Sequence, residues 1–197
     1  MFRIAVTGGL ACGKSTVGEY LSKAGLAVCD ADELAHRLMV PGESVFEEIV
    51  QFFGGDILSD EGEIDRQRLG ARVFSNPKEL EVLNRIVHPE VKKAWGNWLD
   101  CRLKDGCRAA VALVPLLYEA GEAKGWDAVV CVCASRKTQI QRLAGRGLSL
   151  DDINRRIAAQ MPLAKKAELA DYVIMNDESK DLLRQQTMIV LNNVMEK

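Results

Sequence analysis

The residues with the clearest chemical potential lie in GGLACGKS, at positions 8–15. This stretch matches G-x-x-x-x-G-K-[ST], the pattern of loops in which backbone amides and a lysine surround phosphate oxygens. Gly8 and Gly13 permit backbone angles that bulkier residues resist, so that successive amides can point at a phosphate. An ordinary glycine turn would not need a lysine and a serine in register, so the pattern predicts a nucleotide site.

Side chains of this loop have distinct expected roles. We expect Lys14 to reach the β- and γ-phosphates of ATP, Ser15 to give a hydroxyl to Mg²⁺, and Thr16 to be a further phosphate contact. The predicted ATP-binding residues of this segment are Gly8, Gly9, Leu10, Ala11, Cys12, Gly13, Lys14, Ser15 and Thr16.

Two carboxylates, Asp30 and Asp32, stand at the end of the apolar run LAVCD (26–30), with one alanine between them. The carboxyl ends of parallel strands open on a common crevice, so both should face the phosphates held by Lys14. One carboxylate could accept the proton of an attacking hydroxyl, and the other could hold Mg²⁺ through water or fix the first in place. Alternatively, either aspartate could cap the helix expected at ADELAHRLM (31–39).

The elements that must position these groups alternate along the chain. Strand-like apolar runs occur at 2–6, 26–30, 108–119, 127–134 and 171–176, and helical patterns lie between them. This alternation predicts an α/β fold with a doubly wound, five-stranded parallel sheet of the P-loop NTPase type.

One connection in this pattern is too long for a plain crossover, which needs about a dozen residues. It joins the runs at 26–30 and 108–119 and contains helical patterns, so we expect a helical substrate-binding subdomain at about 31–107 within a single domain, 1–197. Pro89 should kink or break the long helix there, directly after His88. The arginine-rich segment at about 136–165 is expected to form a mobile lid over the phosphates.

Composition restricts the class of partner. The net charge of −2 gives no basic field for a nucleic-acid backbone. No apolar run reaches the roughly 18 residues of a membrane span, and the first residues have too short an apolar core for a signal peptide. The six cysteines include no C-x-x-C, so we expect reduced thiols in a cytoplasmic protein. The sequence leaves the oligomeric state open.

Further short segments follow one another in the order of a known family. Together with TGGLACGKS they are DADELAH, PG, FGGDIL, DRQRL, VF, HPEV, VPLLYE and ADYVIMN, between residue 4 and about residue 176. In this the chain resembles the dephospho-CoA kinase family. The resemblance implies transfer of the ATP γ-phosphoryl group to the ribose 3′-hydroxyl of dephospho-coenzyme A, the last step of coenzyme A synthesis, with Mg²⁺ as cofactor. ATP and dephospho-CoA are therefore the expected partners.

The resemblance also assigns roles to residues. It makes Asp32 the catalytic base and Arg142 a clamp that offsets charge in the transition state, and Lys14 completes the predicted catalytic set. Asn176 lies where the backbone usually meets adenine in P-loop kinases, so it is counted with Arg142 among the ATP-binding residues. The predicted substrate-binding residues are Asp32, His36, Arg66, His88, Pro89, Leu117 and Glu119; the predicted metal-binding residues are Ser15 and, through water, Asp30.

Several of these predictions have plainer alternatives. His88 could be a hydrogen-bonding residue at a helix end, and Arg66 could lie on a solvated helix face. Glu119 could hold a metal-bound water or a substrate group, or could start a helix. Another small-molecule kinase, of nucleoside or shikimate type, and a nucleotide-binding regulator without turnover are the alternative functions.

Cys12 stands where the family pattern often has serine. Because a helix N-terminus and a neighbouring lysine both lower the pKa of a thiol, one hypothesis is that Cys12 is sensitive to oxidation and shielded by bound ATP; the other is a tolerated small residue. Cys131 and Cys133 should point to one face of a strand, too alike in direction for an easy disulfide, and belong to the core.

Overall fold

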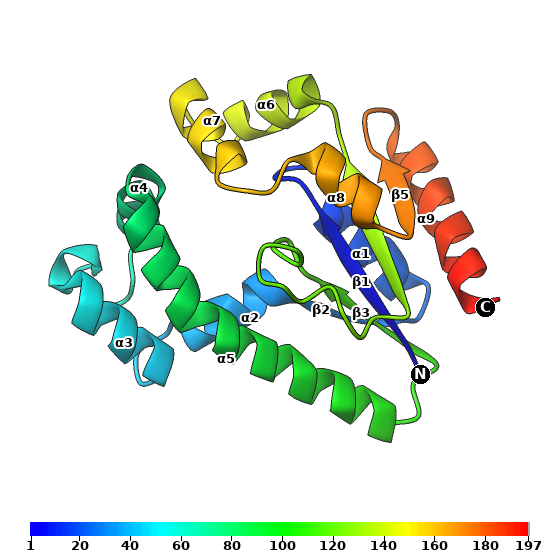
Figure 1. Ribbon diagram of the computed structural model, residues 1–197, viewed down its shortest axis with the longest axis horizontal. Coiled ribbons are helices and arrows are strands. Elements are labelled where there is room, and N and C mark those ends of the chain that lie inside the picture. Colours follow the sequence, from blue (N-terminus) through cyan, green and yellow to red (C-terminus); the bar gives the residue numbers. More distant parts are fainter. Residues whose placement is uncertain (197) are drawn as a thin grey trace. The chain divides into compact units, whose positions relative to one another are not determined.

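The computed structural model describes residues 1–196, and its strands form one five-stranded sheet (Figure 1). Every neighbouring pair of strands is parallel, in the spatial order β2-β3-β1-β4-β5. The strands are β1 (Phe2–Gly8), β2 (Ala27–Asp30), β3 (Ala109–Leu113), β4 (Ala128–Cys133) and β5 (Tyr172–Met175). The predicted α/β fold with a doubly wound parallel sheet is therefore confirmed.

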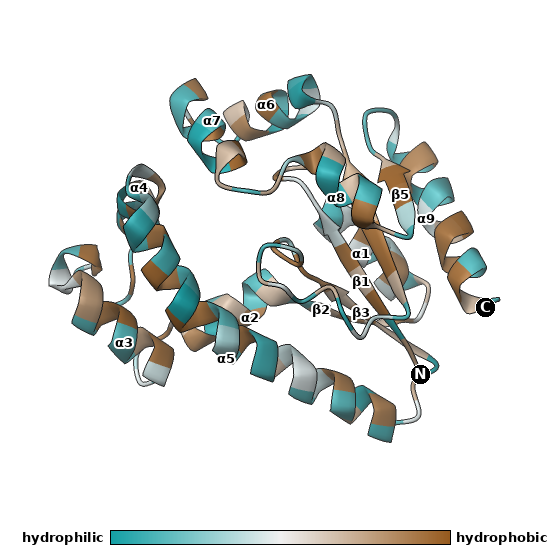
Figure 2. Ribbon diagram, in the orientation of Figure 1, coloured by the Kyte–Doolittle hydropathy of each residue, from teal (hydrophilic) through white to brown (hydrophobic). Residues whose placement is uncertain are grey.

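The inner strands are apolar along nearly their whole length, as Figure 2 shows by their brown colour. All residues of β3 and β4 are buried, which is typical of parallel strands covered on both faces. The strand predicted to continue to residue 119 ends earlier, at Leu113. Val114 donates the last ladder hydrogen bond, to the carbonyl oxygen of Val6, and Pro115 has no N–H with which to continue.

Residues Met1–Asp30 and Trp98–Lys197 form one compact unit. Its helices are α1 (Lys14–Lys23), α6 (Arg136–Ala144), α7 (Leu150–Ala158), α8 (Leu163–Leu169) and α9 (Lys180–Met195). Serines cap three of them at the N-terminus, because Ser135, Ser149 and Ser179 accept a backbone N–H from the first turn of α6, α7 and α9 respectively.

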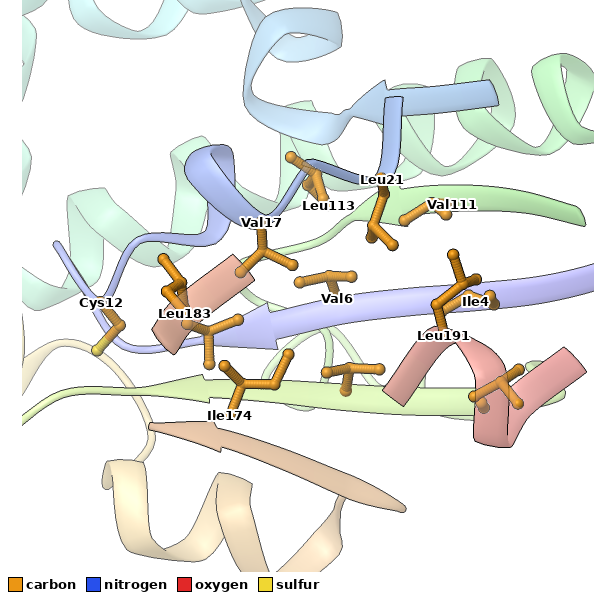
Figure 3. Close-up of a cluster of buried hydrophobic side chains, with 14 of the residues drawn as sticks. Ile4, Val6, Cys12, Val17, Leu21, Val111, Leu113, Ile174, Leu183 and Leu191 are labelled. Carbon is orange, nitrogen blue, oxygen red and sulfur yellow. The ribbon is translucent and has the colours of Figure 1, made fainter. Parts of the chain in front are cut away.

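The core of this unit lies where α1 and α9 pack on the sheet (Figure 3). Ile4 and Val6 of β1 meet Val17 of α1 and Leu183 of α9 there, all of them buried. The loop residue Cys12 belongs to the same cluster. The phosphate loop is thus joined to the main core of the unit.

Residues Ala31–Asn97 form a second compact unit, made of helices. It contains α2 (Ala31–Leu38), α3 (Ser44–Phe53), the short 3₁₀ helix η1 (Gly55–Ile57), α4 (Arg66–Ser75) and most of α5 (Pro77–Lys104). Its own core includes Val45, Ile49, Phe53, Ile57, Leu69 and Val73. Helices thus lie between β2 and β3, where helical patterns were expected. A substrate-binding subdomain at about 31–107 stays a prediction.

Pro89 does not break the long helix, so of the two predicted outcomes the break is wrong, and the kink stays a prediction. α5 continues through it from Pro77 to Lys104 as one helix. Proline removes one backbone donor, which leaves the carbonyl of Arg85 without its intrahelical partner. Because Pro89 and Arg85 are both exposed, water can hydrate that carbonyl and offset part of the loss.

Candidate active site

The phosphate loop connects β1, which ends at Gly8, to α1, which begins at Lys14. Gly8 and Gly13 both have positive φ, 143° and 99°. Both are also in close contact with other elements: a Cβ on Gly8 would lie 2.1 Å from the carbonyl oxygen of Val132, and one on Gly13 would lie 2.1 Å from Nδ2 of Asn176. The two glycines of the motif are therefore required by backbone angle and by space.

The lysine of the motif lies against its own loop. Lys14 Nζ donates hydrogen bonds to the carbonyl oxygens of Gly8 (3.2 Å) and Gly9 (2.9 Å). Ser15 is exposed and Thr16 is half-buried, both in the first turn of α1. That turn, described in full, contains no acidic residue, so the positive end of the helix dipole is available to an anion.

Three side chains hold three consecutive loop carbonyls. Gln139 Nε2 donates to the oxygen of Leu10 (2.7 Å), and Asn176 Nδ2 donates to that of Cys12 (2.7 Å). Between them, Arg142 Nη1 donates to the oxygen of Ala11 at 3.1 Å. Arg142 Nη2 also donates to the backbone oxygen of Asn176 (2.9 Å) and to its Oδ1 (3.3 Å). The structure thus brings the predicted ATP-binding residues Arg142 and Asn176 to the loop; their contacts with a nucleotide stay predictions.

The Cys12 thiol is fully buried, at 0% exposure. Burial raises the pKa of this thiol, and the nearby Lys14, which acts in the opposite direction, does not offset it. Gln139 Nε2 lies 3.4 Å from the sulfur as a hydrogen-bond donor. The expectation of a low-pKa, oxidation-sensitive thiol is therefore wrong, because the loop folds its side chain into the core instead of toward solvent.

The cysteines of β4 are core residues, as predicted. Cys131 and Cys133 are buried, and their sulfur atoms lie 3.7 Å apart in a thiol hydrogen bond. This hydrogen bond, together with burial, raises the pKa of Cys131, whereas the same bond lowers the pKa of Cys133. The pair packs as small hydrophobic residues with one weak polar contact.

The two aspartates occupy different positions around the start of α2. Asp30 is the last residue of β2 and directly precedes the helix, whereas Asp32 is exposed within the first helical turn. Asp30 can therefore still cap α2, as the alternative reading holds. Asp32 cannot cap it, because Asp32 lies inside the helix and not before it. The proposed roles of Asp32 in catalysis and of Asp30 toward a metal stay predictions.

Two predicted substrate-binding residues of the helical unit contact each other. Arg66, the first residue of α4, lies with its Nη1 3.0 Å from Nδ1 of His36 on α2, and both residues are exposed. Since a guanidinium has no acceptor, Nδ1 must be the accepting atom. His88 lies in the interior of α5, so its alternative as a helix-end residue is wrong. Contacts of these residues, and of Pro89, with a substrate stay predictions.

Glu119 starts no helix and forms an ion pair instead. Its Oε1 lies 2.8 Å from Nζ of Lys166 and accepts a hydrogen bond from the backbone N–H of Met161, also at 2.8 Å. Lys166 is completely buried and donates in addition to the carbonyl oxygen of Pro115, at 2.7 Å. Leu117, which lies between Pro115 and Glu119 in the sequence, is fully buried. A substrate contact of Glu119 or Leu117 stays a prediction.

The family model of dephospho-CoA kinase matches residues 2–181 of the chain. The chain belongs to the dephospho-CoA kinase family. It is 41% identical over 189 residues to the dephospho-CoA kinase of Geobacillus kaustophilus. This match covers 95% of this chain and 94% of that protein. The prediction of family, and with it of a kinase, is confirmed.

Solved structures of this family's fold also match. A Thermus thermophilus protein is 33% identical with a TM-score of 0.78, and 97% of each chain is covered. The dephospho-CoA kinase of Campylobacter jejuni is 27% identical with a TM-score of 0.69, and the match covers 98% of this chain and 97% of that one. Of the helices formed by residues 1–196, none is long and apolar enough to cross a membrane.

Sequence reasoning missed two polar residues of this dephospho-CoA kinase family member. Gln139 precedes Arg142 by three positions, so both lie on one face of α6, and that spacing could have indicated a shared partner. No comparable signal marks Lys166 in the sequence, because it stands next to a second lysine of the same helix, Lys165, which is exposed. Only the fold distinguishes the buried lysine from the solvated one.

Proposed function

We propose that the protein transfers the γ-phosphoryl group of Mg·ATP to the ribose 3′-hydroxyl of dephospho-CoA, with Asp32 as the base. Membership of the family gives the reaction class: the protein is a kinase that phosphorylates dephospho-CoA, the final step of coenzyme A synthesis. The match over residues 2–181 carries the proposal, because it includes both the phosphate loop and the whole helical unit.

The donor site is assigned to the loop and to α1. Loop amides and Lys14 would bind the phosphates of ATP, which requires Lys14 Nζ to exchange its bonds with the Gly8 and Gly9 carbonyls for phosphate oxygens. Arg142 would offset negative charge that develops during transfer. Its present bonds to Ala11 and Asn176 support this role, because they keep a guanidinium beside the loop.

Asp32 is assigned as the proton acceptor. Its carboxylate would take the proton of the ribose 3′-hydroxyl while that oxygen bonds to the γ-phosphorus. The bond between the γ-phosphorus and the β,γ-bridging oxygen breaks in the same displacement, and ADP leaves with the electron pair. His36 and Arg66, already joined by a hydrogen bond, are assigned to the acceptor's anionic groups.

The Mg²⁺ ion of the proposal would be held by Ser15. Its hydroxyl is exposed in the first turn of α1, and Mg²⁺ commonly takes one or two protein oxygens together with substrate phosphates, so the residue fits the ion. When bound, Mg²⁺ neutralises charge on the β- and γ-phosphates. Asp30, at the end of β2, would contribute through a water molecule. We place the reaction in the cytoplasm.

A coupled assay of ADP release tests the proposed reaction. Purified protein with Mg·ATP is given dephospho-CoA, adenosine, shikimate or coenzyme A itself, which has no free ribose 3′-hydroxyl. ADP should form with dephospho-CoA alone, and mass spectrometry and NMR should locate the new phosphate on the 3′-oxygen. Turnover with adenosine or shikimate but not with dephospho-CoA would refute the assigned acceptor.

A further inference from the structure

Carbonyl oxygens of the phosphate loop are held by side-chain donors from two distant segments. The carbonyls of Leu10, Ala11 and Cys12 are consecutive, and each accepts one side-chain hydrogen bond. Two of the donors come from α6 and one from the residue that follows β5. Gln139, one of these donors, has no role in the reaction proposed above.

A held carbonyl also fixes the amide in the same peptide plane, because C=O and N–H point in opposite directions across a planar trans unit. The Leu10 carbonyl therefore orients the N–H of Ala11, and the Cys12 carbonyl orients that of Gly13. The N–H of Cys12, which lies between these two, donates a hydrogen bond to the carbonyl oxygen of Gly9 at 3.3 Å and so closes a turn. Gln139 and Asn176 thus hold the peptide planes of the Ala11 and Gly13 N–H groups, two amides that can serve a phosphate.

The loop needs such support because of Ala11. Its φ of 57° lies in the left-handed region, and among residues 1–196 it is the one non-glycine residue with positive φ. An alanine disfavours this conformation and keeps it only where surrounding contacts impose it. The bonds from Gln139 to the carbonyl of Leu10 and from Arg142 to that of Ala11 fix the peptide planes on both sides of this residue.

We propose that Gln139 is a positioning residue for ATP, which acts by holding the phosphate loop in its binding conformation. Gln139 is 4% exposed and donates to two atoms of the loop, Leu10 O and Cys12 Sγ. A Cβ on Gly9 would lie 2.8 Å from its Nε2, so the amide is packed directly on the loop. This inference rests on the proposed ATP site and deepens it.

Substitution of Gln139 without loss of volume tests the inference. Gln139→Met fills the same space without a donor, and Gln139→Glu keeps the shape but presents a carboxylate that cannot donate when ionised. Gln141→Met, at an exposed position of the same helix, is the matched control. Dissociation constants for Mg·ATP are measured by calorimetry without acceptor, together with KM for both substrates, Tm and backbone amide NMR shifts.

Both Gln139 variants should bind Mg·ATP about tenfold more weakly than the parent, since the hydrogen bond that holds the partly buried Leu10 carbonyl is lost. KM for dephospho-CoA should not change, and amide shifts should concentrate at Ala11 and Gly13; the Gln141 variant should match the parent. Equal ATP affinity of parent and variants would overturn the inference alone. An equal loss for both substrates together with a large fall in Tm would also overturn it, as a general structural defect. A parent that binds no ATP would instead refute the proposed function.

Discussion

At the scale of single residues, burial decides what polar groups of the loop region can do. Cys12 combines two features that favour a reactive thiolate, a helix N-terminus and a lysine, yet its side chain is buried and its pKa is raised. Sequence spacing identifies such neighbours but not the direction in which the loop turns the side chain. This is why the motif predicted the backbone angles of Gly8 and Gly13 correctly and the pKa of Cys12 wrongly.

The buried thiol should be chemically inert. Because the Cys12 side chain is fully buried and burial raises the pKa of its thiol, iodoacetamide should modify it far more slowly at pH 8 than the exposed Cys101. Peptide mass spectrometry over a time course measures both sites in one sample, and denatured protein serves as the control in which the two react alike. Alkylation of Cys12 in the native protein at the rate of Cys101 would contradict the structure.

Lys166 should contribute strongly to stability, although it belongs to a short surface helix. Lys166→Met leaves the Glu119 carboxylate and the Pro115 carbonyl without their shared donor, and loss of one partner from a buried ion pair costs several kcal/mol. Because the Glu119 side chain is 20% exposed, we expect a somewhat smaller loss, about 2–3 kcal/mol in the free energy of unfolding.

Urea denaturation measures this loss, with the neighbouring exposed lysine as control. Lys165→Met should change the free energy of unfolding by less than about 0.5 kcal/mol, because an exposed pair such as Lys165–Glu168 is screened by solvent. Equal effects of the two substitutions would show that the buried pair has no special importance.

At the scale of elements, the sequence was most informative where local pattern and chain order sufficed. Apolar runs and glycines located β1, β2, β4 and β5. The end of β3 was misjudged because the apolar run continues beyond Pro115, which ends the ladder. The contacts of α6 with the loop depend on the sheet order and could not be predicted from local pattern.

The N-terminus of α6 should be sensitive to acid through Asp177. Its carboxylate accepts from Thr138 Oγ1 (2.6 Å) and from the backbone N–H of Ser135 (2.9 and 3.0 Å), and these bonds hold its pKa below the usual value of 3.8. A depressed pKa stabilises the fold above about pH 4, and this contribution is lost as the pH falls through the lower, folded-state pKa.

Asp177→Asn should therefore lower the free energy of unfolding at pH 7 by on the order of 1 kcal/mol, after allowance for solvent screening of this exposed group. Such a loss lowers Tm by a few degrees. The difference from the parent should close as the pH falls below about 4. Glu178→Gln, at the next exposed carboxylate, is the control and should follow the parent throughout. A Tm difference for Asp177→Asn that stays constant from pH 7 to pH 3 would contradict the assigned linkage.

At the scale of the whole molecule, the candidate groups are divided between the two compact units. The phosphate loop, Arg142 and Asn176 belong to the unit that contains the sheet, whereas Asp32, His36, Arg66 and His88 belong to Ala31–Asn97. Each unit has its own hydrophobic core. We therefore propose ATP binding for one unit and proton transfer for a residue of the other.

The most direct test is the effect of Asp32→Asn on phosphoryl transfer and on ATP binding, measured on the same preparation. With the base removed, kcat for dephospho-CoA should fall by about 10²- to 10⁴-fold while the dissociation constant for Mg·ATP stays within about twofold. Glu33→Gln, in the same exposed turn of α2, should leave both values unchanged. If Asp32→Asn retains the parent's kcat, Asp32 is not the base and the central claim is contradicted.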